Sequence, residues 1–276
     1  MDNLYSEPCH CCGGFHNEAS TAISISDELL MSALHHIYDG LDVRNDIESD
    51  IFDEVVRLFN TATADGIANS NYFNLSEAFL ESLRTNNEVF SAFRTHRMQN
   101  DMAAQLLDDK GNLKSFEKFV VDVKPIADHY CRAWLETEYS TAVIRAQRAS
   151  EWKKYQSEAD VFPNLRWMPT TSPDPDALHR QYWQAKLTLP INHSFWTRHR
   201  PGDRWNCKCS LEQTDEPSSL EAVADFSPVP EVPGLDNYPA DDGMLFSRSH
   251  SYFTQAYPGA DSAADRAIER RRRKNE

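Results

Sequence analysis

The sequence predicts an α+β protein, in which a predominantly helical N-terminal region precedes a small mixed domain with a tryptophan- and cysteine-rich loop knot. Three observations support this fold class. Apolar residues recur at helical spacing over residues 24–102, and only 9 of the 276 residues are glycine. Residues 164–171 alternate in the manner of a short strand. Residues 187–211 follow neither period, so packing of one apolar face cannot order them.

The composition favours a globular protein of one large or two smaller domains, because 276 residues with 40% hydrophobic content can bury a sizeable core. The net charge of −15 argues against a general nucleic-acid binder, which needs a basic face. The chain has no apolar run of about 18 residues, the length that a membrane span requires, and no signal peptide. We therefore expect no membrane partner.

The first segment, 1–22, is a leader rich in cysteine and histidine. Cys9, Cys11, Cys12 and His16 are soft ligands that lie close together, so the leader is a candidate zinc site. The alternative is a flexible leader whose thiols have no role, because zinc ligands usually come from two separated pairs. The six cysteines of the chain are clustered, which favours metal ligation or reduced thiols in a reducing cytoplasm over a disulfide framework.

The segment 23–110 is expected to be helical. A first helix is capped by Ser26 and stops near Gly40, and a second covers residues 47–62. A third begins near Ser76 and is expected to break near Asn86–Asn87. These helices carry no recognisable catalytic pattern, so their apolar faces are interpreted as core or as a surface for a partner.

The segment 111–214 is expected to form the second domain, after a hinge in the turn-forming residues 108–112. A long helix follows, interrupted or restarted at Pro125. Small residues between Ser140 and Ala149 let another element approach its backbone closely. Charged side chains on this helix are interpreted as ion pairs on its surface rather than as catalytic groups: Glu136, Glu138, Arg145 and Arg148.

The irregular segment 187–211, called the loop knot here, contains the strongest candidate site. Cys207 and Cys209 are two residues apart, and in extended backbone that spacing places both sulfurs on one face. With His179 and either His193 or His199, they would make a closed tetrahedral zinc site that stabilises the knot and catalyses nothing. Alternatively, the cysteines are small buried apolar groups and the histidines are hydrogen-bonded. A nucleophilic cysteine would need a base and an orienting group, and we expect no enzyme.

The last segment, 215–276, is expected to be a Pro-rich acidic arm followed by a basic tail. Residues 215–242 have too few periodic apolar positions to pack, whereas residues 244–253 can dock through their aromatic rings. A basic run near the C-terminus is a solvated tail, or it contacts an acidic partner or DNA: Arg270, Arg271, Arg272, Arg273 and Lys274.

The knot also carries a resemblance. Aromatic packing through four residues is expected to hold it together: Pro190, Phe195, Trp196 and Trp205. Together with Leu189, His199, Pro201, Cys207 and Cys209, these residues resemble the signature of the phage Mu F-like head morphogenesis family. The resemblance extends upstream through residues 136–152 and 164–171 to His179. It departs at residues 174–176, where Asp-Pro-Asp stands in place of the usual acidic and basic pair.

The resemblance implies a minor head protein of a tailed phage or prophage that acts in head morphogenesis. Such a protein is expected to associate with the portal protein and other capsid proteins, and to take part in DNA packaging or ejection, with packaged DNA as a further partner. It would be found in the host bacterial cytoplasm during assembly and then in the virion head, and no small-molecule substrate is implied. The alternatives are a delivery module of a toxin or effector, or a zinc-binding interaction module.

Overall fold

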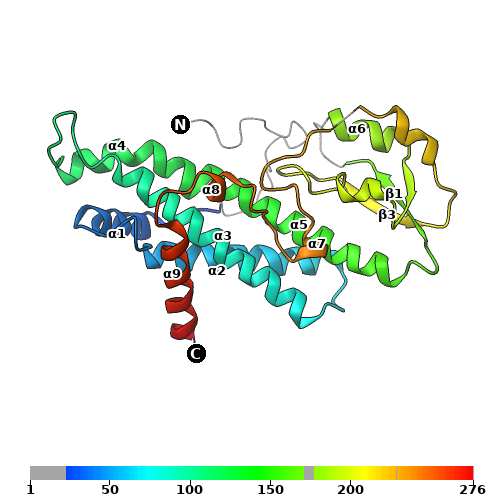
Figure 1. The fold of residues 1–276 in the computed structure, drawn as a ribbon, viewed down its shortest axis with the longest axis horizontal. Helices are drawn as coiled ribbons and strands as arrows, with labels where there is room; N and C mark the ends of the chain where they lie inside the picture. Colours follow the sequence, from blue (N-terminus) through cyan, green and yellow to red (C-terminus); the bar gives the residue numbers. More distant parts are fainter. Residues whose placement is uncertain (1–22, 171–176, 228, 276) are drawn as a thin grey trace. The chain divides into compact units, whose positions relative to one another are not determined.

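The computed structural model describes residues 23–170, 177–227 and 229–275, and it confirms the α+β fold class (Figure 1). Helices dominate, and one three-stranded antiparallel sheet follows the helical region. The chain forms two compact units, each built from segments far apart in the sequence. The helical unit comprises the described residues of Ser20–Asn60, Arg84–Tyr139 and Ser251–Glu276. The sheet unit comprises those of Thr61–Leu83 and Ser140–His250.

The first helices largely follow the predicted pattern. Helix α1 (Asp27–Tyr38) begins after Ser26, whose hydroxyl accepts a hydrogen bond from the backbone N–H of Leu29 at 3.2 Å. Helix α2 covers Ser49–Ser70. Helix α3 (Glu77–Ala103) is continuous, so the predicted break at Asn86–Asn87 is wrong. Asn87 is buried and donates to the side chain of Asn60 at 3.0 Å, which gives this polar residue a partner inside the helical unit.

The interruption predicted at Pro125 occurs later in the chain. Pro125 lies inside α4 (Phe116–Asp128), and a π-helical turn, η1 (His129–Ala133), follows directly. The chain then continues as α5 (Trp134–Ser157). The helix therefore continues past the proline and contains one wider, π-helical turn four residues later.

The core of the helical unit contains a buried ion pair that the sequence analysis missed. Glu138, predicted to lie on the surface, is fully buried, and its carboxylate meets Nε of Arg94 at 2.6 Å. The hydroxyl of Tyr252, in α8 (Ser251–Thr254), donates to the other carboxylate oxygen at 2.6 Å. Arg94 also donates to the backbone carbonyl of Tyr130. The charges are tolerated in the core because they satisfy each other and their neighbours.

The C-terminal basic run belongs to a helix, α9 (Ala260–Asn275), and is paired within the helical unit. Arg271 and Arg272 both contact the carboxylate of Glu88, at 3.0 and 2.7 Å. Lys274 contacts Asp53 at 3.1 Å. Arg270 pairs with Asp46, and Arg273 pairs with Glu269 one turn earlier. Four of the five thus join α9 to acidic side chains of their own unit, and a contact of this run with a partner or with DNA stays a prediction.

In the sheet unit, small residues permit a close helix contact. Gly66 of α2 lies so near α5 that a Cβ atom there would overlap the backbone carbonyl of Val143 and approach the side chain of Ala146. This confirms the expectation from the small residues of the long helix. Arg145, predicted to lie on the helix surface, is buried in this unit.

The sheet has the strand order β2-β1-β3. Strand β1 (Asn164–Met168) is the predicted one, and it pairs antiparallel with β2 (Thr188–Pro190) and β3 (Ser210–Thr214). Its buried side chains alternate with half-buried ones, as the sequence pattern predicts. Helix α6 (Ala177–Gln184) contacts β1. The sheet and α6 therefore form a small frame against which the irregular segments pack.

The knot residues lie in the core of the sheet unit. Phe195 and Trp196 belong to a 3₁₀ turn, η2 (Ser194–Thr197), and both are buried. The indole N–H of Trp196 donates to the backbone carbonyl of Pro190 at 2.9 Å, which closes the loop after β2. Trp205 is also buried and stacks on Phe246 with ring centres 5.8 Å apart.

The Pro-rich segment 215–242 is packed, so the prediction of an unpacked arm is wrong. Its described residues include η3 (Leu220–Asp225) and α7 (Pro239–Asp242). Val229 and Tyr238 are buried in the core of the sheet unit, and Tyr238 meets Trp152 edge-on with ring centres 5.1 Å apart. An extended segment can insert single apolar side chains between its prolines, and such insertion needs no period in the sequence. Among the described helices, none is both long and apolar enough to cross a bilayer.

Candidate metal centre

A histidine and two cysteines meet in the core of the sheet unit. His179, on α6, is fully buried, with Trp167 edge-on against its ring at 5.1 Å. Its Nδ1 atom lies 3.5 Å from Sγ of Cys207 and 3.6 Å from Sγ of Cys209. The three ligand atoms all lie within 4.8 Å of one another. This group could hold a metal ion, as the sequence predicted for these three residues.

The backbone before β3 brings both sulfurs to the same histidine. Cys207 and Cys209 lie in the irregular stretch that leads into β3, and both sulfurs face Nδ1 of His179. The preceding residue, Asn206, has a left-handed backbone with φ of 56° and donates its N–H to the hydroxyl of Thr141 at 3.0 Å. This hydrogen bond fixes the start of the cysteine stretch against α5.

The spacing of the group matches tetrahedral zinc coordination. Zinc binds thiolate sulfur at about 2.3 Å and imidazole nitrogen at about 2.0–2.1 Å, so two ligands at the tetrahedral angle stand about 3.6 Å apart. The two sulfur–nitrogen distances at His179 are 3.5 and 3.6 Å. The residues present therefore fit a zinc ion at these two edges. The same distances also suit weak thiol–imidazole hydrogen bonds, which are the alternative interpretation.

Asp203 holds the other side of the imidazole. Its Oδ1 atom lies 3.0 Å from Nε2 of His179, in a charge contact that falls short of an aligned hydrogen bond. When the imidazole is neutral, as a metal ligand must be, a carboxylate at this position favours the proton on Nε2 and leaves the Nδ1 lone pair facing the sulfurs. Histidines that bind metals usually have such a carboxylate or carbonyl partner on the second ring nitrogen. Asp203 thus orients the ligand atom without itself joining the group.

The electrostatics of the group favour a thiolate at Cys207. A hydrogen bond from Cys209, followed by the charge of His179, holds the pKa of Cys207 well below its usual range although burial opposes this. The hydrogen bond with Cys207 and burial raise the pKa of Cys209. Burial alone would lower the pKa of His179, but Asp203 and Cys207 raise it well above its ordinary value. One sulfur of the pair is therefore already prepared as a ligand.

The two other histidine candidates lie outside the group of three ligand atoms. His193 caps η2, where its Nδ1 accepts the N–H of Phe195 at 3.1 Å. His199 packs on the ring of Phe195 at 4.9 Å, and burial lowers its pKa. The described residues thus supply three ligands of the four that the sequence predicted. The second candidate cluster lies outside the described residues: Cys9, Cys11, Cys12 and His16.

The arrangement permits two kinds of chemistry. Three protein ligands could hold zinc with a fourth position for another group. Alternatively, the order thiol, imidazole and carboxylate is that of an activated cysteine nucleophile. Cys207 and His179 both have 0% exposure, so a substrate cannot reach the sulfur in this conformation. Burial therefore favours metal binding or a purely structural role over nucleophilic catalysis.

Sequence reasoning missed Asp203 because its context is that of a turn. It follows Pro201 and Gly202, and aspartate next to such residues is common in turns for purely local reasons. The only available signal was its position four residues before Cys207.

Comparisons of the chain with protein-family models, curated proteins and solved structures found no match.

Proposed function

We propose that this chain is a minor head protein of a tailed phage or prophage, similar to the phage Mu F-like head morphogenesis proteins. One observation carries the proposal. The residues on which the resemblance rests come from three segments of the sequence, and several of them share one buried core in the sheet unit: Trp152, Leu165, Trp167, Leu189, Phe195, Trp196, Cys207 and Cys209. A motif whose members pack together is more specific than the same letters scattered over a surface.

Zinc is the cofactor that we propose for the centre. His179, Cys207 and Cys209 would hold it, and the ion would stabilise the loop between β2 and β3, which has few backbone hydrogen bonds of its own. A structural ion supplies no chemistry to a substrate, so this proposal describes an assembly protein without enzymatic activity. The sulfur–nitrogen spacing and the carboxylate behind the imidazole support it.

The partners that we propose are the portal protein and other capsid proteins, reached in the host cytoplasm before the protein enters the virion head. The net charge of −15 supports protein partners, because an acidic chain is repelled by DNA phosphates. The basic residues of α9 are paired with Asp46, Asp53 and Glu88. This pairing favours a protein contact over a DNA contact, although packaged DNA remains a proposed neighbour.

Quantitative mass spectrometry of purified particles from the source phage or prophage tests this proposal. Empty and DNA-filled heads are compared, and the particles are cross-linked before digestion. We expect a few copies per particle in both, with cross-links from this chain to the portal protein. Absence of the chain from every particle would contradict the head-protein proposal.

A zinc-binding interaction module outside any virion is the second candidate, and the buried His179–Cys207–Cys209 group is the observation that favours it. Mass spectrometry of the particles, together with zinc analysis of the purified chain, distinguishes the head protein from the interaction module. A purified chain that carries zinc but is absent from particles supports the interaction module. A chain found in particles supports the head protein, with or without the ion.

A further inference from the structure

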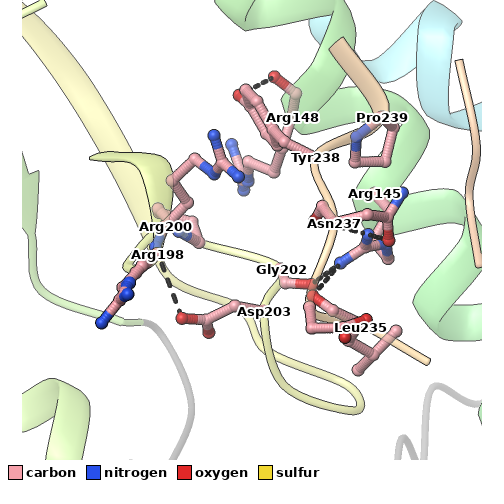
Figure 2. A pocket seen from close by; sticks show the side chains of 12 residues that line it. Arg145, Arg148, Arg198, Arg200, Gly202, Asp203, Leu235, Asn237, Tyr238 and Pro239 are labelled. Atoms are coloured by element: carbon pink, nitrogen blue, oxygen red, sulfur yellow. Dashed lines mark hydrogen bonds between the residues drawn. The ribbon is translucent and has the colours of Figure 1, made fainter. Parts of the chain in front are cut away.

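Four arginine side chains line one hollow of the sheet unit, although the chain as a whole is strongly acidic. The hollow has a volume of about 290 Å³, including space open to solvent, and lies beside α5 and the loop that follows η2 (Figure 2). The charged lining residues are Arg145, Arg148, Arg198, Arg200, Asp203 and Asp236. Three of these arginines also form ion pairs with carboxylates outside the lining: Arg148 with Glu151, Arg198 with Glu231 and Arg200 with Asp241.

Arg145 is a buried cation whose hydrogen bonds go to neutral groups. Its guanidinium donates to the backbone carbonyls of Leu245 at 2.7 Å, Gly202 at 2.6 Å and Leu235 at 3.3 Å. It also donates to the carbonyl and the side-chain oxygen of Asn237, at 3.1 and 2.7 Å (Figure 2). Burial, followed by the charge of a neighbouring arginine, lowers the pKa of Arg145 to about 10. Its hydrogen-bonding groups thus have acceptors, but none of the described carboxylates forms an ion pair with it.

Arg200 is the second buried cation of the hollow. Only 7% of it is exposed, and its guanidinium stands 3.6 Å from the centre of the Tyr238 ring. Burial lowers its pKa. Its guanidinium pairs with Asp241 at 3.6 Å, but Asp241 is 62% exposed, so water screens that pair. Arg200 is therefore balanced by a ring face and a weak ion pair.

The Nε–H group of Arg148 is a hydrogen-bond donor without an acceptor among the described residues. One terminal N–H group pairs with Glu151, but the Nε atom is buried without a hydrogen-bond partner among the described residues. Leaving a buried donor of a charged group unsatisfied is unfavourable, and an incoming acceptor would remove that cost. Arg198 is 75% exposed and can move toward a ligand. The hollow thus combines two buried guanidinium groups, those of Arg145 and Arg200, with an unused donor on Arg148.

We propose that this hollow binds a doubly charged oxyanion of the phosphate type, either free phosphate or the terminal phosphate of a small phosphomonoester. A phosphate group carries between about 1.5 and 2 negative charges at neutral pH, whereas a carboxylate carries one, so a phosphate is attracted more strongly to the two buried guanidinium groups. Arginine is also suited to phosphate because its N–H groups match the oxygen spacing. This ligand site is independent of the proposed head function.

The size of the hollow restricts how the ligand enters. Its volume of about 290 Å³ includes space open to solvent. The charged head of a ligand would therefore approach the arginines from the open side, and the rest of the molecule would stay outside. The phosphodiester backbone of DNA fits less well, because each of its phosphates carries one charge and its length would meet the acidic surface of the chain.

Isothermal titration calorimetry on the full chain tests the proposal. Sodium phosphate, adenosine monophosphate, sodium acetate and a short DNA duplex are titrated separately at constant ionic strength. Phosphate should bind, and acetate should bind about tenfold more weakly or worse, as expected for the loss of charge-assisted hydrogen bonds. Binding of the monophosphate as well would place its ester outside the hollow. Failure of phosphate to bind, or tighter binding of the duplex or acetate, would overturn the proposal.

Arginine variants place the ligand in the hollow. Arg148→Gln and Arg200→Gln should each weaken phosphate binding about tenfold or more, because each removes one charged donor. Arg180→Gln is the matched control, since Arg180 is exposed on α6 and does not line the hollow. Melting curves of all three variants check that they fold. Equal weakening in the control, or unchanged binding in folded Arg148→Gln, would contradict the assignment.

Discussion

The helical unit and the sheet unit bury polar groups in different ways. In the helical unit, Arg94 and Glu138 form a buried ion pair inside a framework of regular helices. In the sheet unit, His179 and the two cysteines lie among aromatic rings in a region with short strands and long irregular segments. Regular helices already satisfy their own backbone groups, so the ion pair is an addition to an ordered frame. The irregular segments have no such frame and depend on side-chain packing.

This contrast implies that the two units respond to different perturbations. Removal of metal or of a large ring should affect the sheet unit, whereas removal of one buried charge should affect the helical unit. Hydrogen exchange read peptide by peptide distinguishes them, because it reports the local free energy of opening in each segment. Tryptophan fluorescence adds a second probe, since all of the six tryptophans except Trp134 lie in the sheet unit.

The largest expected effect is the loss of zinc. Structural zinc contributes apparent binding free energies of about 10 kcal/mol or more in small zinc-dependent domains. Cys207→Ser should therefore remove the ion from the purified chain, as measured by elemental analysis, and increase exchange in the sheet unit alone. Cys131→Ser is the control, because Cys131 is a buried free thiol in the helical unit and outside the metal group. Zinc retained by Cys207→Ser would remove this residue from the site.

Elemental analysis of leader variants sharpens the same test. One zinc per chain that survives Cys9→Ser and Cys11→Ser but not Cys209→Ser would assign the ion to the buried group. A second equivalent that disappears with the leader variants would assign a separate ion to the leader. One equivalent that both sets of variants abolish would indicate that the two clusters share it.

Breaking the buried ion pair should be the next largest effect. Glu138→Gln leaves Arg94 charged in the core, and removing one partner of such a pair costs about 3–5 kcal/mol of unfolding free energy. Urea denaturation measures the loss, and exchange should increase first in the helical unit. The double variant Arg94→Met with Glu138→Leu removes both charges and should be less destabilised than the single one. Equal exchange in both units would contradict the division of roles.

Truncation of Trp205 tests whether aromatic packing stabilises the sheet unit. The buried ring stacks on Phe246, and removal of a buried tryptophan costs about 3–5 kcal/mol. Trp205→Ala should lower the melting temperature and loosen the sheet unit, while zinc binding persists if packing and coordination are separable. Trp183→Ala serves as a control, because this ring is only partly buried. An unchanged melting temperature for Trp205→Ala would show that the ring is outside the core.

The smallest effect is expected at α9. Lys274 pairs with Asp53 at 3.1 Å, but the lysine side chain is 70% exposed, and such pairs contribute about 0–1 kcal/mol. Lys274→Ala should barely change the unfolding free energy at physiological salt. A loss that grows as salt is lowered would fit screened pairing between α9 and the acidic side chains. A large loss at every salt concentration would require a role for Lys274 beyond this ion pair.

The parts of the fold that local rules govern were predictable from the sequence. Ser26 caps its helix, β1 occupies its alternating segment, and the spacing of Cys207 and Cys209 places both sulfurs at one histidine. Each of these follows from a side chain and its near neighbours. The identity of His179 as the shared partner came from the family resemblance and the residue type.

The missed features depend on contacts between distant segments. The burial of Glu138 requires Arg94 and Tyr252 from other parts of the chain. The burial of Arg145 requires carbonyl groups more than fifty residues away. Helical spacing alone cannot distinguish such residues from surface charges. The Pro-rich segment was misjudged for a similar reason, because its buried side chains have no period that reveals them.

The division of the chain between the two units has a consequence for the order in which they can form during synthesis. The helical unit takes its first helix from near the N-terminus and its last from residues up to 275, while the sheet unit is completed only at His250. Segments already made must wait for partners still inside the ribosome, and their apolar faces stay uncovered meanwhile. No single cut in the chain yields two whole units, so expression of isolated fragments would leave at least one unit without part of its core.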